Sequence, residues 1–224
     1  VTYTNVSSGR LPPRIPFHAR AGVEVAGYLP RLLTAMGATR RNQSDREMLL
    51  GIPYAEYLKA DFDFAPTYRW DDRNTLAGHF ALGVAYPYGN SIVLPFEKRY
   101  YGGGANSVRG WSTRTLGPGT YNNDSLGYDF ANKTGDIKLD MSLEYRRKLT
   151  TLFELAGFID VANVWTVKDY RSQPGGYFTW NSFYKELAAA YGLGLRLDLN
   201  FLLVRVDLGM KAHNPALPEG ERWS

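Results

Sequence analysis

The chain has 224 residues, 44% of them hydrophobic and 14% aromatic, which is too apolar a composition for a disordered protein. It contains no cysteine, so disulfide bonds and thiolate metal sites are excluded. The net charge is +4, but the basic residues are scattered and cluster only at 40–41 and 146–148, which disfavours a nucleic-acid groove. No apolar run reaches the roughly 18 residues that a transmembrane helix needs.

Apolar and polar residues alternate along most of the chain, a period-two pattern that predicts β-strands. Residues 1–4 read as the tail of one strand, and the whole sequence reads as a fragment of a larger protein. In 59–70 the even positions are all apolar, whereas the odd positions include Lys59, Asp61 and Asp63. The pattern predicts about eight strands. They cover 17–29, 59–70, 75–86, 92–101, 137–149, 153–165, 187–199 and 202–210.

Two architectures fit this alternation. In a soluble barrel or sandwich the apolar faces form the core, whereas in a membrane barrel they contact lipid and the polar faces line the lumen. The strands are long enough to cross a bilayer at a tilt, and aromatic residues gather near their ends. The polar faces also mix both charge signs with glycine and alanine. We therefore predict an all-β fold, a transmembrane antiparallel β-barrel.

The connections between the predicted strands differ in length. Short turns are expected at 86–90, 149–151 and 199–201, and long loops at 102–135 and 166–185. Outer-membrane barrels show this asymmetry, because their periplasmic turns are short and their surface loops long.

Two connections break the expected order. Residues 71–74 form a tight connection where a long loop is due, and 30–53 is long where a turn is due. In the latter, the stretch from Ser44 to Glu47 has the residues of a helix N-cap and first turn.

The first long loop begins with the glycine-rich segment GGGANSVRGW, residues 102–111. Gly102, Gly103 and Gly104 allow backbone conformations and close contacts that larger residues prevent. No lysine–serine or lysine–threonine pair follows, so the segment is not a phosphate-binding loop. Its apolar residues, such as Trp111, favour an ordered lid or plug over disorder.

The glycine-rich segment resembles the signature of the BamA/TamA superfamily of outer-membrane assembly factors, the bacterial surface antigen family. The resemblance extends from Gly103 to Trp111 and on to a Leu-Gly-Pro sequence at 116–118. Further stretches that resemble the family's later strands, in the right order, are 143–146, 158–165, 191–196 and 205–209. Ala162 stands where the family usually has glycine. The resemblance is good over 97–211 and rests on pattern alone over the first 90 residues.

In that family the tip formed here by Val108, Arg109, Gly110 and Trp111 folds back into the barrel. The resemblance therefore implies that this chain is the C-terminal half of a barrel, with the loop at about 102–135 inside the lumen. It also implies that the family's periplasmic domains and terminal strand are not in this chain.

An arginine in a lumen needs carboxylate partners, because an unpaired guanidinium away from water is unfavourable. Glu144 and Asp160 lie on the polar faces of two successive predicted strands, so both are expected to point into the lumen. The planar fork of Arg109 can bridge them, while Gly110 leaves room and Trp111 wedges the tip. Residue types alone equally allow an exposed loop arginine, with Asp160 paired elsewhere.

The other polar groups do not predict a catalytic or metal site. The histidines are not at metal-ligand spacing, and the aspartates at 61 and 63 and at 71 and 72 suit a lumen lining and a turn better than a calcium site. Gly192 and Gly194 are expected to make space for the loop rather than to bind a nucleotide. We predict no enzyme activity, no metal and no cofactor.

The resemblance implies a factor that inserts and folds β-barrel proteins in the outer membrane of a Gram-negative bacterium. The implied partners are unfolded β-barrel clients, the lipid bilayer and accessory lipoproteins, and not nucleic acid. Two other functions stay open: an exporter of the two-partner-secretion type, which shares the Arg-Gly loop, and a passive channel. A third alternative is a soluble β-sandwich binding module, which would need its polar faces on the outside.

Overall fold

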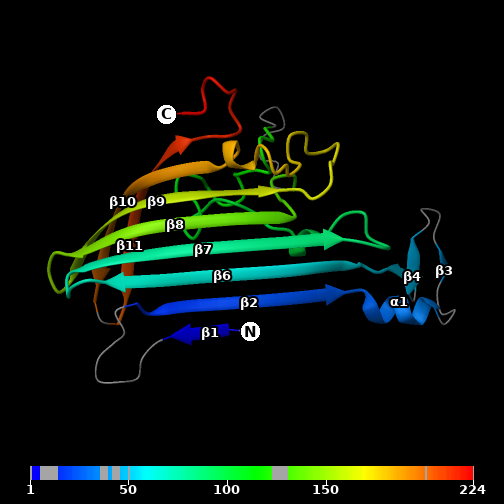
Figure 1. The fold of residues 1–224 in the computed structure, drawn as a ribbon, viewed down its shortest axis with the longest axis horizontal. Coiled ribbons are helices and arrows are strands. Elements are labelled where there is room, and N and C mark those ends of the chain that lie inside the picture. Colours follow the sequence, from blue (N-terminus) through cyan, green and yellow to red (C-terminus); the bar gives the residue numbers. More distant parts are fainter. Residues whose placement is uncertain are drawn as a thin grey trace.

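The computed structural model describes residues 2–5, 15–35, 40–41, 46–49, 51–122, 131–199 and 201–223. Its main element is a curved antiparallel sheet of eight strands (Figure 1). In spatial order these are β1 (Thr2–Asn5), β2 (Phe17–Ala26), β6 (Tyr57–Arg69), β7 (Asn74–Pro87), β8 (Ile137–Lys148), β9 (Phe153–Trp165), β10 (Ala188–Asp198) and β11 (Leu203–His213). Each strand therefore pairs with the strands that precede and follow it within the sheet.

Along the chain, a helix and a second, smaller sheet come between β2 and β6. The helix is α1 (Tyr28–Ala35), and the three short strands are β3 (Arg40–Arg41), β4 (Glu47–Leu49) and β5 (Ile52–Pro53). No helix in the described ranges is both long and apolar enough to cross a membrane. The predicted helix start at 44–47 is wrong for Glu47, which lies in β4, and Ser44 lies outside the described residues.

Seven of the predicted strands are present, the one at 153–165 with the predicted ends and six with shifted ends, but the strand predicted at 92–101 is wrong. Pro95 cannot donate a ladder hydrogen bond, and a short 3-10 turn, Phe96–Lys98, follows it. The apolar Leu94 packs against Tyr57 and Ala85 in a small buried cluster and is not part of a strand. The eighth strand is instead β1, where the sequence suggested the tail of a strand.

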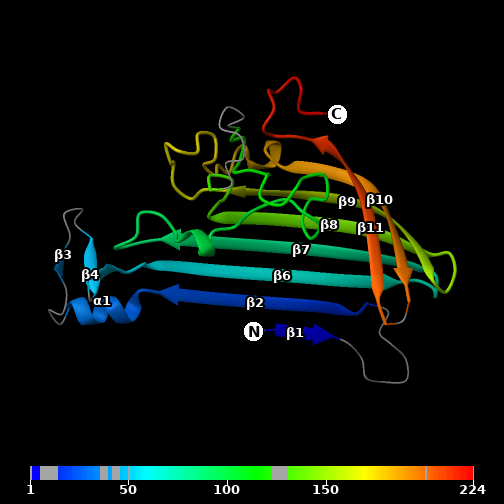
Figure 2. The same cartoon turned by 180° about the vertical axis from the view of Figure 1, so that it is seen from behind.

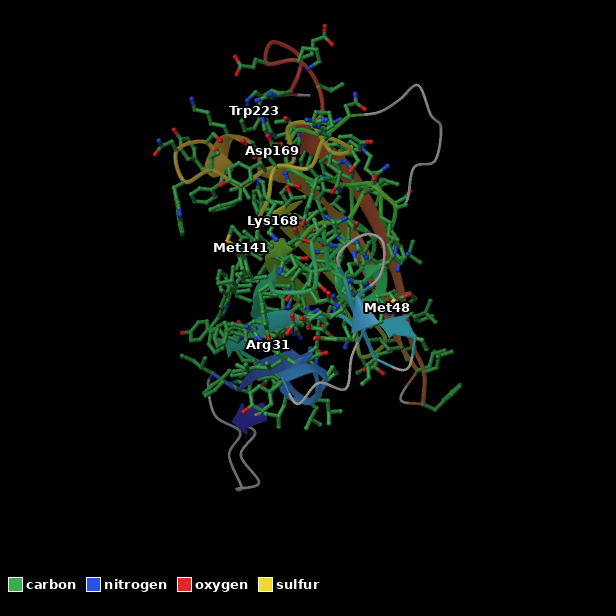
Figure 3. The ribbon with its side chains drawn as sticks, turned by 90° about the vertical axis from the view of Figure 1, so that its right-hand side faces the viewer. Arg31, Met48, Met141, Lys168, Asp169 and Trp223 are labelled. Atoms are coloured by element: carbon green, nitrogen blue, oxygen red, sulfur yellow. The ribbon has the colours of Figure 1, made fainter. Side chains whose placement is uncertain are left out.

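Because 92–101 is not a strand, the two connections that broke the expected order now fit the alternation of short and long connections. The short connections, 70–73, 149–152 and 199–202, all lie at one end of the sheet. The long connections, 27–56, 88–136 and 166–187, all lie at the other end. The predicted short turn at 86–90 is therefore the start of a long loop. Figure 3 looks onto this long-loop end, where Arg31 of α1, Met48 of β4 and Lys168 of the last loop are labelled.

The two faces of the sheet have opposite chemistry. Large apolar side chains on the outer face are exposed, with 62% exposure for Leu193 and 70% for Leu208. Charged side chains on the inner face are buried, with 0% exposure for Asp140 and Asp160. A water-soluble fold would bury the apolar side chains instead. The alternation is therefore that of a barrel wall whose outer face meets lipid.

Candidate functional site

The glycine-rich segment folds into a compact loop that lies on the inner, concave face of the sheet. Seen from behind in Figure 2, the green segment of the chain lies across the sheet while β11 curls beside it. Gly103 and Gly104 have φ values of 87° and 96°, which residues with side chains rarely adopt. The amide of Gly104 donates to the carbonyl of Trp111 (2.8 Å), and that of Arg114 donates to the carbonyl of Gly102 (3.1 Å). These bonds close the loop on itself.

An apolar cluster fixes this loop to the wall. Val108, Trp111 and Leu116 are buried and pack on three alanines of β9 and β10. The alanines are Ala162, Ala188 and Ala190. Small residues on the inner face thus leave the volume that the tryptophan fills. Ala162, which departs from the glycine of the family pattern, is part of this contact.

Arg109 is held by Asp160 of β9 through both its backbone and its side chain. Its Nε donates to Asp160 Oδ2 and its Nη2 to Asp160 Oδ1, both at 2.8 Å, and its backbone amide donates to Oδ2 at 3.1 Å. Ser142 of β8 donates to the same carboxylate at 2.7 Å. The side chains of Arg109 and Asp160 are 6% and 0% exposed, so this is a buried, two-pronged ion pair.

Glu144 of β8 is the second carboxylate on Arg109, and it also serves two other arginines. Arg109 Nη1 donates to Glu144 Oε2 at 2.6 Å. The other oxygen, Oε1, accepts from Arg146 Nε at 2.6 Å and from Arg196 Nη2 of β10. The structure therefore brings together Arg109, Glu144 and Asp160, the three charged residues that the sequence pattern selected.

Two further contacts of Arg109 did not come from the sequence. Asp207 of β11 lies 3.4 Å from Arg109 Nη1, and the ring of Phe158 lies under the guanidinium, with its centroid 3.3 Å from Cζ. Phe158 is only 4% exposed although it is on the polar face of β9. The sequence does carry one indication of this contact, because Phe158 is an aromatic residue at a position where the alternation calls for a polar one.

Four glycines allow the loop and its partners to approach the wall closely. A Cβ on Gly209 would lie 2.7 Å from the carbonyl oxygen of Arg109, and one on Gly110 would lie 3.0 Å from Ala190 Cβ. A Cβ on Gly192 would lie 2.0 Å from the carbonyl oxygen of Leu208 and 2.5 Å from the Phe158 ring, and one on Gly194 would lie 2.4 Å from Asp207 Oδ1. The glycine pair in β10 therefore makes space for the partners of Arg109, while Gly209 accommodates the loop itself.

Replacing Phe158 by leucine is expected to lower the free energy of unfolding by about 0.5–2 kcal/mol, because the cation–π contact is lost while an apolar side chain remains. The measurement is urea unfolding of the full-length protein in detergent. Phe153→Leu, at an exposed position of the same strand, is the control and should change stability less. Equal losses in the two variants would contradict a specific contact between Phe158 and Arg109.

A second set of contacts ties the loop 88–136 to the loop 166–187. Gln173 donates from Nε2 to the carbonyl of Thr134 (2.7 Å) and accepts from Arg99 Nη2 (2.9 Å). Arg99 Nε in turn donates to Asp136 Oδ1 at 3.2 Å. Asn163 of β9 donates to the carbonyl of Gly119 at 3.0 Å. The loops 88–136 and 166–187 are thus joined to each other, and the first of them also to β9.

Two of the other polar residues considered in the sequence, His79 and Asp71, have local partners. His79 Nε2 lies 3.0 Å from Asp63 Oδ2 on the inner face, and Asp71 accepts from the backbone amides of Arg73 and Asn74 at 2.7 and 2.6 Å, which closes the turn after β6. Within the described ranges, no three residues among His, Asp and Glu gather as metal ligands do.

A sheet that exposes its apolar side chains and buries its charges inside is the wall of a transmembrane β-barrel. Residues 48–224 match the Omp85 superfamily domain, which is more than half of the chain, so the protein belongs to the Omp85 superfamily. The family resemblance of the glycine-rich segment and its following strands is thereby confirmed.

Two relatives give the extent of the similarity. The Outer membrane protein assembly factor BamA of Neisseria meningitidis serogroup B is 33% identical over 92 residues, which are 40% of this chain and 11% of that protein. The crystal structure of BamA from Haemophilus ducreyi lacking POTRA domains 1–3 shares the fold with a TM-score of 0.63 at 16% identity. That match covers 100% of this chain and 39% of the other. The chain thus spans a minor part of each relative.

Proposed function

We propose that this chain is part of an outer-membrane protein assembly factor, which inserts and folds β-barrel proteins in the outer membrane of a Gram-negative bacterium. The observation that carries the proposal is the buried ionic network that fixes the Arg109 loop to the inner wall. This is the loop by which the segment resembles the assembly-factor family. Support also comes from the match to the Neisseria protein, whose name states the activity.

No covalent step is required for this activity, and we propose that the protein is not an enzyme and uses no cofactor. An unfolded strand in lipid has unsatisfied backbone groups, which are unfavourable by several kcal/mol each. A client that closes its own hydrogen bonds as a barrel releases this free energy. The assembly factor lowers the barrier, and its partners are unfolded clients, lipid and accessory lipoproteins.

Depletion of the full-length protein in its own organism tests this function. Quantitative mass spectrometry of the outer membrane is expected to show loss of many β-barrel proteins together. Restoring the wild-type protein, or the Arg147→Ala variant at an exposed position of β8, should restore them.

Different outcomes separate the alternatives. Loss of a single secreted protein would identify an exporter of the two-partner-secretion type. An unchanged set of outer-membrane proteins would contradict an assembly factor and favour a passive channel.

A further inference from the structure

A cavity of about 330 Å³ lies between the loop and the inner wall, beside the Arg109 network. Its lining comes from loop residues 105–107 and from the inner faces of β6, β7, β8, β10 and β11. The charged residues on this lining are Arg109, Arg146, Arg196, Arg205 and Glu144. Four cationic side chains thus face the cavity with one carboxylate among them.

That single carboxylate is already fully engaged. Glu144 accepts from Arg109 with one oxygen and from Arg146 and Arg196 with the other. Asp160 and Asp207, which also contact Arg109, are not part of the lining. Arg205 is also engaged, because its Nε lies 3.0 Å from Asp207 Oδ2 and its Nη2 donates to the carbonyl of Ala105 at 2.9 Å. Donors without a partner therefore have to come from other groups on the lining.

Two donors on the lining are buried without partners. Among the described residues, neither Ser107 Oγ nor Arg196 Nε has a hydrogen-bond partner. Ser107 is 9% exposed and the Arg196 side chain 8%. Glu154 Oε1 lies 3.8 Å from Arg196 Nε, which is beyond hydrogen-bond distance. Buried donors of this kind are unfavourable unless a ligand, an ion or a water molecule satisfies them.

We propose that this cavity binds a phosphate-type oxyanion, with donors from Ser107 Oγ and from the guanidinium groups of Arg196 and Arg146. Arginine is suited to this role because its planar fork matches the oxygens of a phosphate. The same chemistry belongs to free phosphate and to a phospholipid headgroup. Because Ser107 is on the loop and both arginines are on the wall, the anion would join the loop to the wall at a second point.

Isothermal titration calorimetry on the full-length protein in detergent tests the site, with chloride buffers of matched ionic strength. The probes are inorganic phosphate and glycerol 3-phosphate, the latter representing a phospholipid headgroup. The wild type is expected to bind with saturation at one site. Ser107→Ala should weaken binding about tenfold, because a hydrogen bond to a charged group is lost.

Two further variants keep the test independent of folding defects. Ser112→Ala changes an exposed serine of the same loop and should bind as the wild type does. Arg146→Gln removes a part-exposed cation and should weaken binding. Tighter binding of glycerol 3-phosphate would assign the site to a lipid headgroup, and tighter binding of phosphate to the free anion. The proposal is overturned if neither probe saturates, or if Ser107→Ala and Arg146→Gln both bind like the wild type.

Discussion

Replacing Arg109 by alanine is expected to lower the free energy of unfolding by about 3–5 kcal/mol, because it leaves buried carboxylates without their cation. Asp160 loses the two of its four described hydrogen bonds that come from the guanidinium. It keeps the bond from Ser142, and the one from the backbone amide of residue 109 where the loop keeps its place. Glu144 keeps Arg146 and Arg196, so most of the effect should arise at Asp160. The loop should then leave the wall.

This result can be measured as heat-dependent unfolding on gels and as protease cleavage within 102–122. Arg109→Lys keeps the charge but not the planar fork, so it should lose part of the stability. Arg147→Ala, at an exposed arginine of β8, is the matched control and should change stability by less than about 0.5 kcal/mol. If Arg109→Ala unfolds at the same temperature as Arg147→Ala, the loop is not held by this ion pair.

Gly209→Ala is expected to displace the loop without removing any of its side chains. The added Cβ would lie 2.7 Å from the carbonyl oxygen and 2.8 Å from the carbonyl carbon of Arg109. These are backbone atoms that cannot rotate away, so the loop has to shift and its ion pairs weaken. Overpacking of this kind usually lowers stability by about 1–3 kcal/mol.

Urea unfolding and protease cleavage of the loop measure this effect, with Gly157→Ala as the control. At Gly157 the added Cβ would meet only Leu193 Cδ2, at 3.9 Å, which is an ordinary contact. The combination of Gly209→Ala with Arg109→Ala should be less destabilising than the sum of the two, because both act on the same network. Strict additivity would show that Gly209 acts elsewhere.

The part of the site that follows from local alternation could be predicted from the sequence. A period of two decides which side chains face inward, and Glu144 and Asp160 occupy inward positions of neighbouring strands. Distances are not needed for that inference. Asp207 could not be predicted as a partner of Arg109, because their contact depends on how far the sheet curves between β8 and β11.

The errors in the predicted fold also have physical causes. The segment at 92–101 has strand-like apolar spacing, but Pro95 and the packing of Leu94 determine its structure. The helix α1 was missed because it has only eight residues and carries Pro30, which is tolerated in a first helical turn. Successive connections in an antiparallel sheet lie at opposite ends of the sheet. One falsely predicted strand therefore assigned every connection before it to the wrong end.

The position of Arg109 in the chain has a consequence for the order of folding events. The strands of the sheet pair with sequence neighbours, and such local contacts form early. Arg109 precedes its partners, which lie 35, 51 and 98 residues further along at Glu144, Asp160 and Asp207. The ionic network is therefore complete only after β8, β9 and β11 have been added. The loop can therefore reach its final position only once these strands are in place.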